Sequence, residues 1–352
     1  MVTSETVTSE IATMFTSKTI FRNLSLVTTA AIFATISMTS CANESVMQDT
    51  TRPVVISATD FQLPFVGDGV SELPTTVQSA DDVAVTISDT SRIVVLNEAI
   101  AEIVVSLGFI DKIIGRDATT TLDALAKVPE VSSGHDISAE SVLELQPTLV
   151  IGDTRSGPPE AIQQLRGAGV SILLAPEVWK LSDIAPRIEL ISTALGVTKN
   201  GVALLDDTQK SISNALKTLG ADQNAPRVAF VYVRGTASVF LLGGKESGAD
   251  EMIRSAGGID VGSDLGLAAF TPLTTEAIVN ANPEIIVVTT RGLASVGGIS
   301  GLLDLPGIAQ TPAAKSRAVV SIDDDLLFSF GPRTGELIVR MAKAFKILTP
   351  KN

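Results

Sequence analysis

The chain has 352 residues, of which 45% are hydrophobic, and its 26 Lys and Arg against 39 Asp and Glu give a formal net charge of −13. That length is sufficient for two domains with a substantial core. The acidic balance argues against nucleic acid, and against an anionic bilayer surface, as binding partners.

An uncharged stretch near the N-terminus has the layout of an export signal. Residues 23–40 carry no charge, contain an apolar run and follow Lys18 and Arg22. The stretch ends in Met38-Thr39-Ser40-Cys41, which resembles a bacterial lipobox, where the cysteine is acylated and becomes the mature N-terminus. Cys41 is the only cysteine of the chain, so it cannot form an internal disulfide. We predict a lipoprotein signal peptide over 1–40 and lipidation of Cys41; the many Ser and Thr residues disfavour a transmembrane anchor.

The rest of the chain divides into four segments by composition and periodicity. Residues 41–89 are rich in Thr, Ser, Asp and Pro, which favours a flexible, partly extended tether. From Arg92 onward, short β-branched runs alternate with helical patterns, which is the signature of parallel α/β units. The pattern predicts an N-terminal lobe over 90–196, a linking helix over 197–222 and a C-terminal lobe over 223–352. We expect an α/β fold of two Rossmann-like lobes, each a mostly parallel sheet flanked by helices.

Hydrophobic periodicity predicts the individual elements of the first lobe. Strands are expected at 93–96, 148–152 and 170–174, and helices at 98–107, 138–146 and 159–167. A helix-rich stretch from Leu181 to Leu219 follows, with one interruption around 196–201. A second α/β series begins with a strand at Arg227–Val233.

An internal repeat supports the two-lobe arrangement. Residues 138–142 followed by 147–151 match residues 274–278 followed by 283–287, and Glu140 and Glu276 occupy equivalent places in the two copies. Each copy has the pattern of a helix opened by a hydroxyl residue, a proline-bearing turn and a buried strand. Two similar lobes would bind a ligand in the cleft between them, at the carboxyl ends of their strands.

The order of elements resembles that of the ABC-importer binding proteins with a rigid helical hinge, which bind cobalamin, ferric siderophores or haem. Within that class, the stretch from about Arg92 to Ile347 is most similar to the haemin-binding lipoproteins of Gram-positive haem importers, the HmuT type. Each matching segment is weak by itself, and their order makes the match specific. The segments are 134–142, 228–235, 248–250, 256–258, 270–274 and 327–331.

The resemblance implies an iron-binding site formed by both lobes. In that family a histidine of the N-terminal lobe and a tyrosine of the C-terminal lobe ligate haem iron, and an arginine two residues after the tyrosine supports it. The matching positions are His135, Tyr232 and Arg234. The resemblance further implies non-covalently held haem b as the transported ligand, the permease and ATPase subunits of an ABC importer as partners, a monomer, and attachment to the extracellular side of the cell membrane through Cys41.

The same three residues suit this chemistry independently of the family. The chain has one histidine, one tyrosine and one tryptophan. A neutral imidazole is a good iron ligand, and Asp136 beside His135 could orient its ring. Residues two apart on a strand face the same side, so Arg234 can lie beside the phenol of Tyr232 and favour the phenolate. On spacing alone, a solvated loop histidine and a core or rim tyrosine are the commoner outcomes.

Glu140 and Glu276 form a second candidate site. In the family that the chain resembles, one glutamate on each lobe meets arginines of the permease, and these two hold the matching places. An acid in the first turn of a helix is also stabilised by roughly 0.3 to 1 kcal/mol whatever its function, so helix capping is the alternative. Arg155, Arg291 and Arg333 lie in loop-like segments, where a solvated charge is the common outcome.

Two other functions compete with haem binding as interpretations of this sequence. A ferric siderophore or cobalamin carrier of the same class stays open. A secreted α/β hydrolase is disfavoured, because the chain lacks a Gly-x-Ser-x-Gly elbow and its one histidine precedes a helix of the first lobe. The sequence has neither a Rossmann fingerprint nor a P-loop, and we expect no enzymatic activity.

Overall fold

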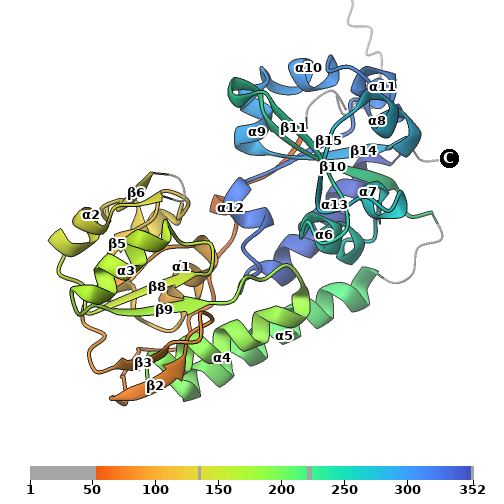
Figure 1. Ribbon diagram of the computed structural model, residues 1–352. Helices are drawn as coiled ribbons and strands as arrows, with labels where there is room; N and C mark the ends of the chain where they lie inside the picture. Colours follow the sequence, from red (N-terminus) through yellow and green to blue (C-terminus); the bar gives the residue numbers. More distant parts are fainter. Residues whose placement is uncertain (1–52, 134–135, 220–223, 350–352) are drawn as a thin grey trace, which may run out of the picture. The chain divides into compact units, whose positions relative to one another are not determined.

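The computed structural model describes residues 53–133, 136–219 and 224–349, and Figure 1 shows how their elements follow one another. All of these residues belong to one unit, Asp49–Asn352. This unit is built on one parallel sheet and one mixed, mostly parallel sheet, both flanked by helices, which confirms the predicted α/β fold class. No helix among the described residues is both long and apolar enough to cross a membrane.

The N-terminal lobe is built on a four-stranded parallel sheet in the order β5-β4-β8-β9. Its strands are β4 (Ile93–Val95), β5 (Ile113–Arg116), β8 (Leu149–Asp153) and β9 (Ser171–Ala175). Its helices are α1 (Glu98–Ser106), α2 (Ala139–Glu144), α3 (Pro159–Gly167) and α4 (Ile184–Ala194). Shorter elements are β6 (Ser132–Ser133), β7 (Asp136–Ile137) and the 3₁₀ turns Ile110–Lys112, Asp123–Leu125 and Leu181–Asp183. The central strands β4 and β8 are fully buried, because helices cover both faces of the sheet.

The C-terminal lobe is built on a seven-stranded mixed sheet. Strands β1 (Val54–Ile56), β15 (Val319–Ile322), β14 (Ile285–Thr289) and β10 (Arg227–Arg234) pair in parallel, and β12 (Ile259–Asp260) also pairs with β10. Strands β11 (Val239–Gly243) and β13 (Phe270–Pro272) extend the sheet in antiparallel order. Its α-helices are α6 (Ala249–Ser255), α7 (Val261–Asp264), α8 (Thr275–Ala281), α9 (Thr290–Ser295), α10 (Gly298–Leu303), α11 (Pro312–Ser316), α12 (Asp324–Leu327) and α13 (Thr334–Leu348). Two 3₁₀ turns span Gly235–Ala237 and Ile308–Gln310.

The longest helix, α5 (Thr198–Leu219), occupies most of the segment for which a linking helix is predicted. It packs against α4 on one side and α13 on the other. Gly335 at the start of α13 allows this close approach, because a Cβ atom there would lie 2.3 Å from the hydroxyl oxygen of Ser211 on α5. The interruption predicted around 196–201 separates α4 from α5.

Residues 53–89 differ from the predicted tether, because they pack on both lobes. Strand β1 pairs with β15 of the C-terminal lobe, with Val54 opposite Val320. The chain then passes through a 3₁₀ turn, Ala58–Asp60, to the hairpin formed by β2 (Thr75–Gln78) and β3 (Ala84–Ile87), which contacts α4 and β9. Backbone hydrogen bonds fix this segment to the N-terminal lobe, for example from the Ala80 amide to the Leu174 carbonyl at 2.8 Å. The expectation of a flexible tether is therefore wrong for residues 53–89.

Candidate functional site

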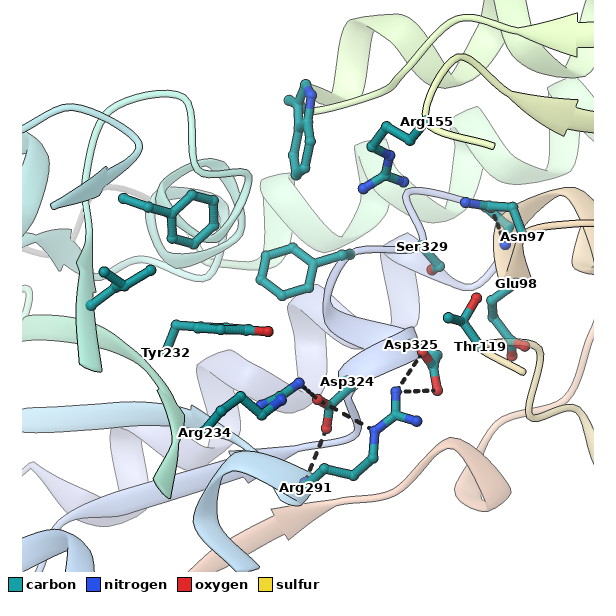
Figure 2. A pocket seen from close by; sticks show the side chains of 15 residues that line it. Asn97, Glu98, Thr119, Arg155, Tyr232, Arg234, Arg291, Asp324, Asp325 and Ser329 are labelled. Carbon is teal, nitrogen blue, oxygen red and sulfur yellow. Dashed lines mark hydrogen bonds and ion pairs between the residues drawn. The ribbon is translucent and has the colours of Figure 1, made fainter. Parts of the chain in front are cut away.

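A cavity of about 400 Å³ lies between the two lobes and receives side chains from both. Figure 2 shows the side chains that line it. Most of them follow the carboxyl ends of parallel strands: Asn97 follows β4, Arg155 follows β8, Arg291 follows β14, and Arg234 is the last residue of β10. This is the edge of a parallel sheet where ligands usually bind.

Tyr232 stands on β10 and forms part of the cavity wall. Its ring makes an edge-to-face contact with Phe270 of β13, with ring centroids 6.0 Å apart. Its cross-strand neighbour is Leu241 of β11, which also lines the cavity. In Figure 2 the phenol oxygen points into the space between the lobes. The ring is therefore held by apolar neighbours while its hydroxyl group faces the cavity.

Arg234 lies against Tyr232, as the two-residue spacing predicts. The guanidinium carbon is 4.5 Å from the centroid of the tyrosine ring, within the range of a cation–π interaction. The guanidinium also forms an ion pair with Asp324 and donates to the hydroxyl oxygen of Thr289 at 3.2 Å. The Asp324 side chain is buried, so Arg234 is held in place by a carboxylate shielded from water.

Arg155 occupies a different part of the cavity wall, in the N-terminal lobe. Its Nη2 lies 2.9 Å from Oδ2 of Asp153, and the same carboxylate oxygen accepts from the Asn97 amide at 3.0 Å. The guanidinium carbon is 5.2 Å from the ring centroid of Trp179. Trp179 in turn makes an edge-to-face contact with Phe328, at 6.5 Å between centroids. The cavity thus has a second aromatic wall, with a cation at its edge.

Arg291 follows β14 and is bound by two acids of α12. Its Nη2 donates to both carboxylate oxygens of Asp325, at 2.9 and 3.1 Å, and its backbone amide donates to Asp324 at 3.0 Å. Burial raises the pKa of the Asp325 carboxyl to about 6, although the positive charge of Arg291 opposes the shift.

Glu98 lines the cavity at the start of α1 and connects it to a buried ion-pair cluster. Its carboxylate accepts from Arg333 at 2.8 Å and from the Thr121 amide at 2.7 Å. Arg333 also pairs with Glu102 at 2.7 Å. The pKa of Glu98 is raised to about 8, mainly because the carboxyl group is buried. The negative charge of Glu102 also raises this pKa, and it does so by more than the positive charge of Arg333 lowers it. The prediction of a solvated loop charge is wrong for Arg333, which is only 3% exposed because its partners lie on α1.

The predicted site residues fall into three groups. Tyr232 and Arg234 line one cavity. Glu140 and Glu276 lie in the first turns of α2 and α8, both exposed and outside the cavity lining. His135 and Cys41 lie outside the described residues.

Sequence reasoning missed several wall residues and left two arginines unassigned. Trp179, Glu98 and Asp325 carry no motif, and only the fold brings them to the cavity. Phe270 and Phe328 lie in two segments that carry the family resemblance, but the resemblance implies no role for these two side chains. For Arg155 and Arg291 the sequence predicts solvated charges, and in the structure each lines the cavity. Within the described ranges, no cluster of three or more His, Cys, Asp or Glu side chains is arranged to hold a metal ion.

Solved structures similar to this chain include two haem-binding proteins. The haem-binding protein HmuT is 31% identical, with a TM-score of 0.76 over 84% of this chain and 98% of HmuT. Variants of HmuT in which a tyrosine, the arginine two residues after it, or a histidine is replaced by alanine are similar to the same extent. The periplasmic haem-binding protein RhuT from Roseiflexus sp. RS-1 is 37% identical, with a TM-score of 0.71 over 74% of this chain and 99% of RhuT.

The curated relatives are more distant. The uncharacterized ABC transporter substrate-binding lipoprotein YvrC of Bacillus subtilis is 28% identical over 77% of this chain and 85% of its own length. A cobalamin-binding protein of Halobacterium salinarum is 25% identical over 79% of this chain and 76% of its own length. A model of the periplasmic binding protein family matches residues 93–326. That match spans both lobes and every strand end that lines the cavity, and this chain belongs to the periplasmic binding protein family.

Proposed function

We propose that this protein binds haem b non-covalently in the cavity between its lobes and delivers it to an ABC importer, with Tyr232 and His135 as the axial ligands of the iron. The observation that carries the proposal is the placement of Tyr232, whose hydroxyl group faces a cavity with aromatic walls while Arg234 lies against its ring.

The chemistry of the cavity suits a ferric porphyrin. Tyrosine ligates haem iron as the phenolate, and the positive charge of Arg234 favours that anionic form. Trp179, Phe328 and Phe270 provide flat apolar surface for a large aromatic ring. An imidazole from the opposite lobe would complete the axial pair, and His135 is the only histidine of the chain.

The solved relatives support this ligand. HmuT and RhuT are haem-binding proteins by name, and both are more than 30% identical to this chain. The residues replaced in the HmuT variants include a tyrosine and an arginine two positions apart, which is the spacing of Tyr232 and Arg234. YvrC supports the wider assignment to an ABC transporter substrate-binding lipoprotein.

The second candidate function is cobalamin binding, because relatives in Halobacterium salinarum bear that name. Cobalamin carries its own axial ligands and presents an amide-rich periphery, so it needs neither the phenolate of Tyr232 nor a cation beside it. The Tyr232–Arg234 pair therefore favours haem. We infer no catalytic activity, since the protein family and the named relatives are binding proteins.

The delivery step assigns roles to residues outside the cavity. Glu140 and Glu276 would dock the two lobes on the permease of the importer, whose ATPase subunits drive uptake. An acyl group on Cys41 would hold the protein, as a monomer, on the extracellular face of the cell membrane.

The experiment is an absorbance titration of the purified protein with haemin and, separately, with cyanocobalamin. We expect a haemin complex with a shifted Soret band and a phenolate-to-iron charge-transfer band, and no complex with cyanocobalamin. Tyr232→Phe keeps the ring beside Arg234 and removes only the ligating oxygen, so it should abolish the charge-transfer band and weaken binding more than His135→Ala, whose place water can take. An unchanged spectrum and affinity in Tyr232→Phe would refute the ligand assignment, and preferential binding of cyanocobalamin would favour the second candidate.

A further inference from the structure

Arg155 and Arg291 extend from different lobes into the same cavity, and each has a guanidinium nitrogen, Nη1, that is available to a ligand. Figure 2 shows the two guanidinium groups on opposite sides of the space that Tyr232 faces. Their side chains are 38% and 53% exposed, although both residues line the cavity. Neither residue takes part in the proposed iron ligation.

Arg155 is held by groups that leave one edge of it available. Within the described residues its hydrogen bonds use the backbone amide, Nε and Nη2, and all three go to the Asp153 carboxylate. Asp153 is 2% exposed and also accepts from Asn97, so its position is fixed by two partners. The contact with Trp179 fixes the guanidinium plane from another side. Arg155 is therefore preorganised, with Nη1 directed at no acceptor among the described residues.

Arg291, in the C-terminal lobe, is likewise fixed in position by carboxylates. Its contacts to Asp324 and Asp325 use the backbone amide, Nε and Nη2, which again leaves Nη1 without an acceptor in the described part of the chain. A planar guanidinium that is fixed along one edge by a carboxylate can bind a second carboxylate along another edge.

The free donor atoms of the two arginines, and not a net charge, are what this cavity offers an anion. The chain carries a formal net charge of −13, and the carboxylates beside the cavity pair with its arginines: Arg155 with Asp153, and Arg291 with Asp324 and Asp325. A bound anion would therefore be held at close range by the unused donors of Arg155 and Arg291, where screening by salt is weak.

We propose that Arg155 and Arg291 each bind one carboxylate of a planar dicarboxylic ligand, and that they select the free acid against neutral or amidated macrocycles. This inference rests on the proposed haem-binding function and adds the residues that recognise the periphery of the ligand. Asp153 acts as a positioning residue for Arg155. The pair would also explain discrimination against cobalamin, whose side chains end mostly in amides and cannot form charge-assisted bonds of this kind.

The first arm of the test changes the ligand and leaves the protein intact. Wild-type protein is titrated with haemin and with haemin dimethyl ester in the same detergent-containing buffer, with the Soret band followed in each case. Two lost charge-assisted contacts predict that the ester binds about 100-fold more weakly than the acid. Equal affinities for acid and ester would overturn the inference while leaving haem binding intact. Failure of both ligands to bind would instead refute the proposed function.

The second arm changes the arginines. Arg155→Gln and Arg291→Gln should each weaken acid binding by about tenfold and leave ester binding nearly unchanged, so that the double variant no longer distinguishes the two ligands. Lys210→Gln on α5 is the matched control, since it removes the same charge from an exposed position that does not line the cavity. Arg155→Lys should restore only part of the selectivity, because a lysine cannot reproduce the fork of donors. Equal weakening of acid and ester, or no weakening in either variant, would contradict the assignment.

Discussion

Arg333, at the start of α13, forms an ion pair of 2.7 Å with Glu102 of α1, and both side chains are almost fully buried, at 2% and 0% exposed. The pair joins the C-terminal helix to the N-terminal lobe beneath the cavity wall. Arg333 also donates to the carbonyl oxygen of Ala58 at 3.2 Å, so the segment that follows β1 meets both lobes at this point. The ion-pair cluster is therefore a joint where three parts of the chain converge.

Replacing Arg333 by methionine should destabilise the protein by about 3–5 kcal/mol, because it leaves the fully buried Glu102 carboxylate without its cation. Urea unfolding of the wild type and the variant measures the difference. Arg340→Met on the same helix is the control, since its ion pair with Glu336 is partly exposed and contributes about 0–1 kcal/mol. Similar losses in the two variants would show that the buried cluster has no special role in stability.

The raised pKa of Glu98 predicts a stability that falls with increasing pH. Burial lifts this pKa from 4.5 to about 8. Between these values the folded protein keeps a proton that the unfolded chain releases, so the free energy of unfolding decreases as pH rises through this window. Glu98→Gln mimics the neutral form and should flatten the decrease between pH 5 and 9, as measured by the urea midpoint. Glu160→Gln, at an exposed position of α3, should keep the wild-type slope, and an equally steep slope in Glu98→Gln would contradict the prediction.

Much of the fold was predictable because its signals are local. The runs at Ile93, Thr148 and Val170 form β4, β8 and β9, and the two repeat copies form equivalent helices capped by Ser138 and Thr274. The ordering of residues 53–89 was not predictable in this way. Strand β1 is only three residues long, and its partner, β15, is more than 260 positions away in the chain. Composition describes such a segment, but long-range pairing decides whether it is ordered.

In the candidate site, too, the sequence predicts the contacts that depend on local geometry and not those that depend on long-range packing. The adjacency of Tyr232 and Arg234 follows from strand geometry, because side chains two residues apart share a face. The Arg155–Trp179 contact depends instead on the pairing of β8 with β9 and on the loops that follow them, which no local pattern encodes. The burial of Arg333 likewise depends on long-range contacts: its neighbours in sequence indicate a loop, and its neighbours in space are two buried acids.

Loss of the cation beside Tyr232 should make the haem complex more sensitive to acid. Arg234→Ala leaves both proposed ligands in place but removes the positive charge that favours the phenolate, so protons compete better for the oxygen. We expect weaker haemin binding, and release at a higher pH than in the wild type, when the Soret band is followed during acidification. The conservative variant Arg234→Lys should recover part of the shift. If Arg234→Ala releases haem at the same pH as the wild type, Arg234 does not support the proposed iron ligand.

The lipid anchor predicts a simple fractionation result. Cys41→Ser removes the acyl acceptor and should move the protein from the membrane fraction to the soluble or secreted fraction. Cys41 lies outside the described residues, and haemin titration of the purified variant checks that the folded part is intact. Co-fractionation of the variant with membranes, together with no incorporation of labelled fatty acid into the wild type, would refute lipidation.

The docking role of Glu140 and Glu276 can be separated from helix capping. Both acids are exposed in the first turns of α2 and α8, at equivalent places of the repeat and outside the cavity lining. If they dock the two lobes on permease cations, Glu140→Ala with Glu276→Ala should abolish haem-dependent growth while the haemin spectrum and affinity stay unchanged. Each substitution should cost only about 0.3–1 kcal/mol of stability, because each acid also interacts with the dipole of its helix.

A double variant at two other first-turn acids provides the control for that experiment. Glu160 of α3 and Glu336 of α13 are partly or fully exposed and also lie outside the cavity lining, so their replacement by alanine removes the same charge and a similar helix-dipole interaction. If docking is specific, this control supports growth at the wild-type rate although its stability falls by a comparable amount. Equal growth defects in the two double variants would attribute the effect to stability or net charge. Normal growth of the Glu140/Glu276 variant would leave helix capping as the only role of these acids.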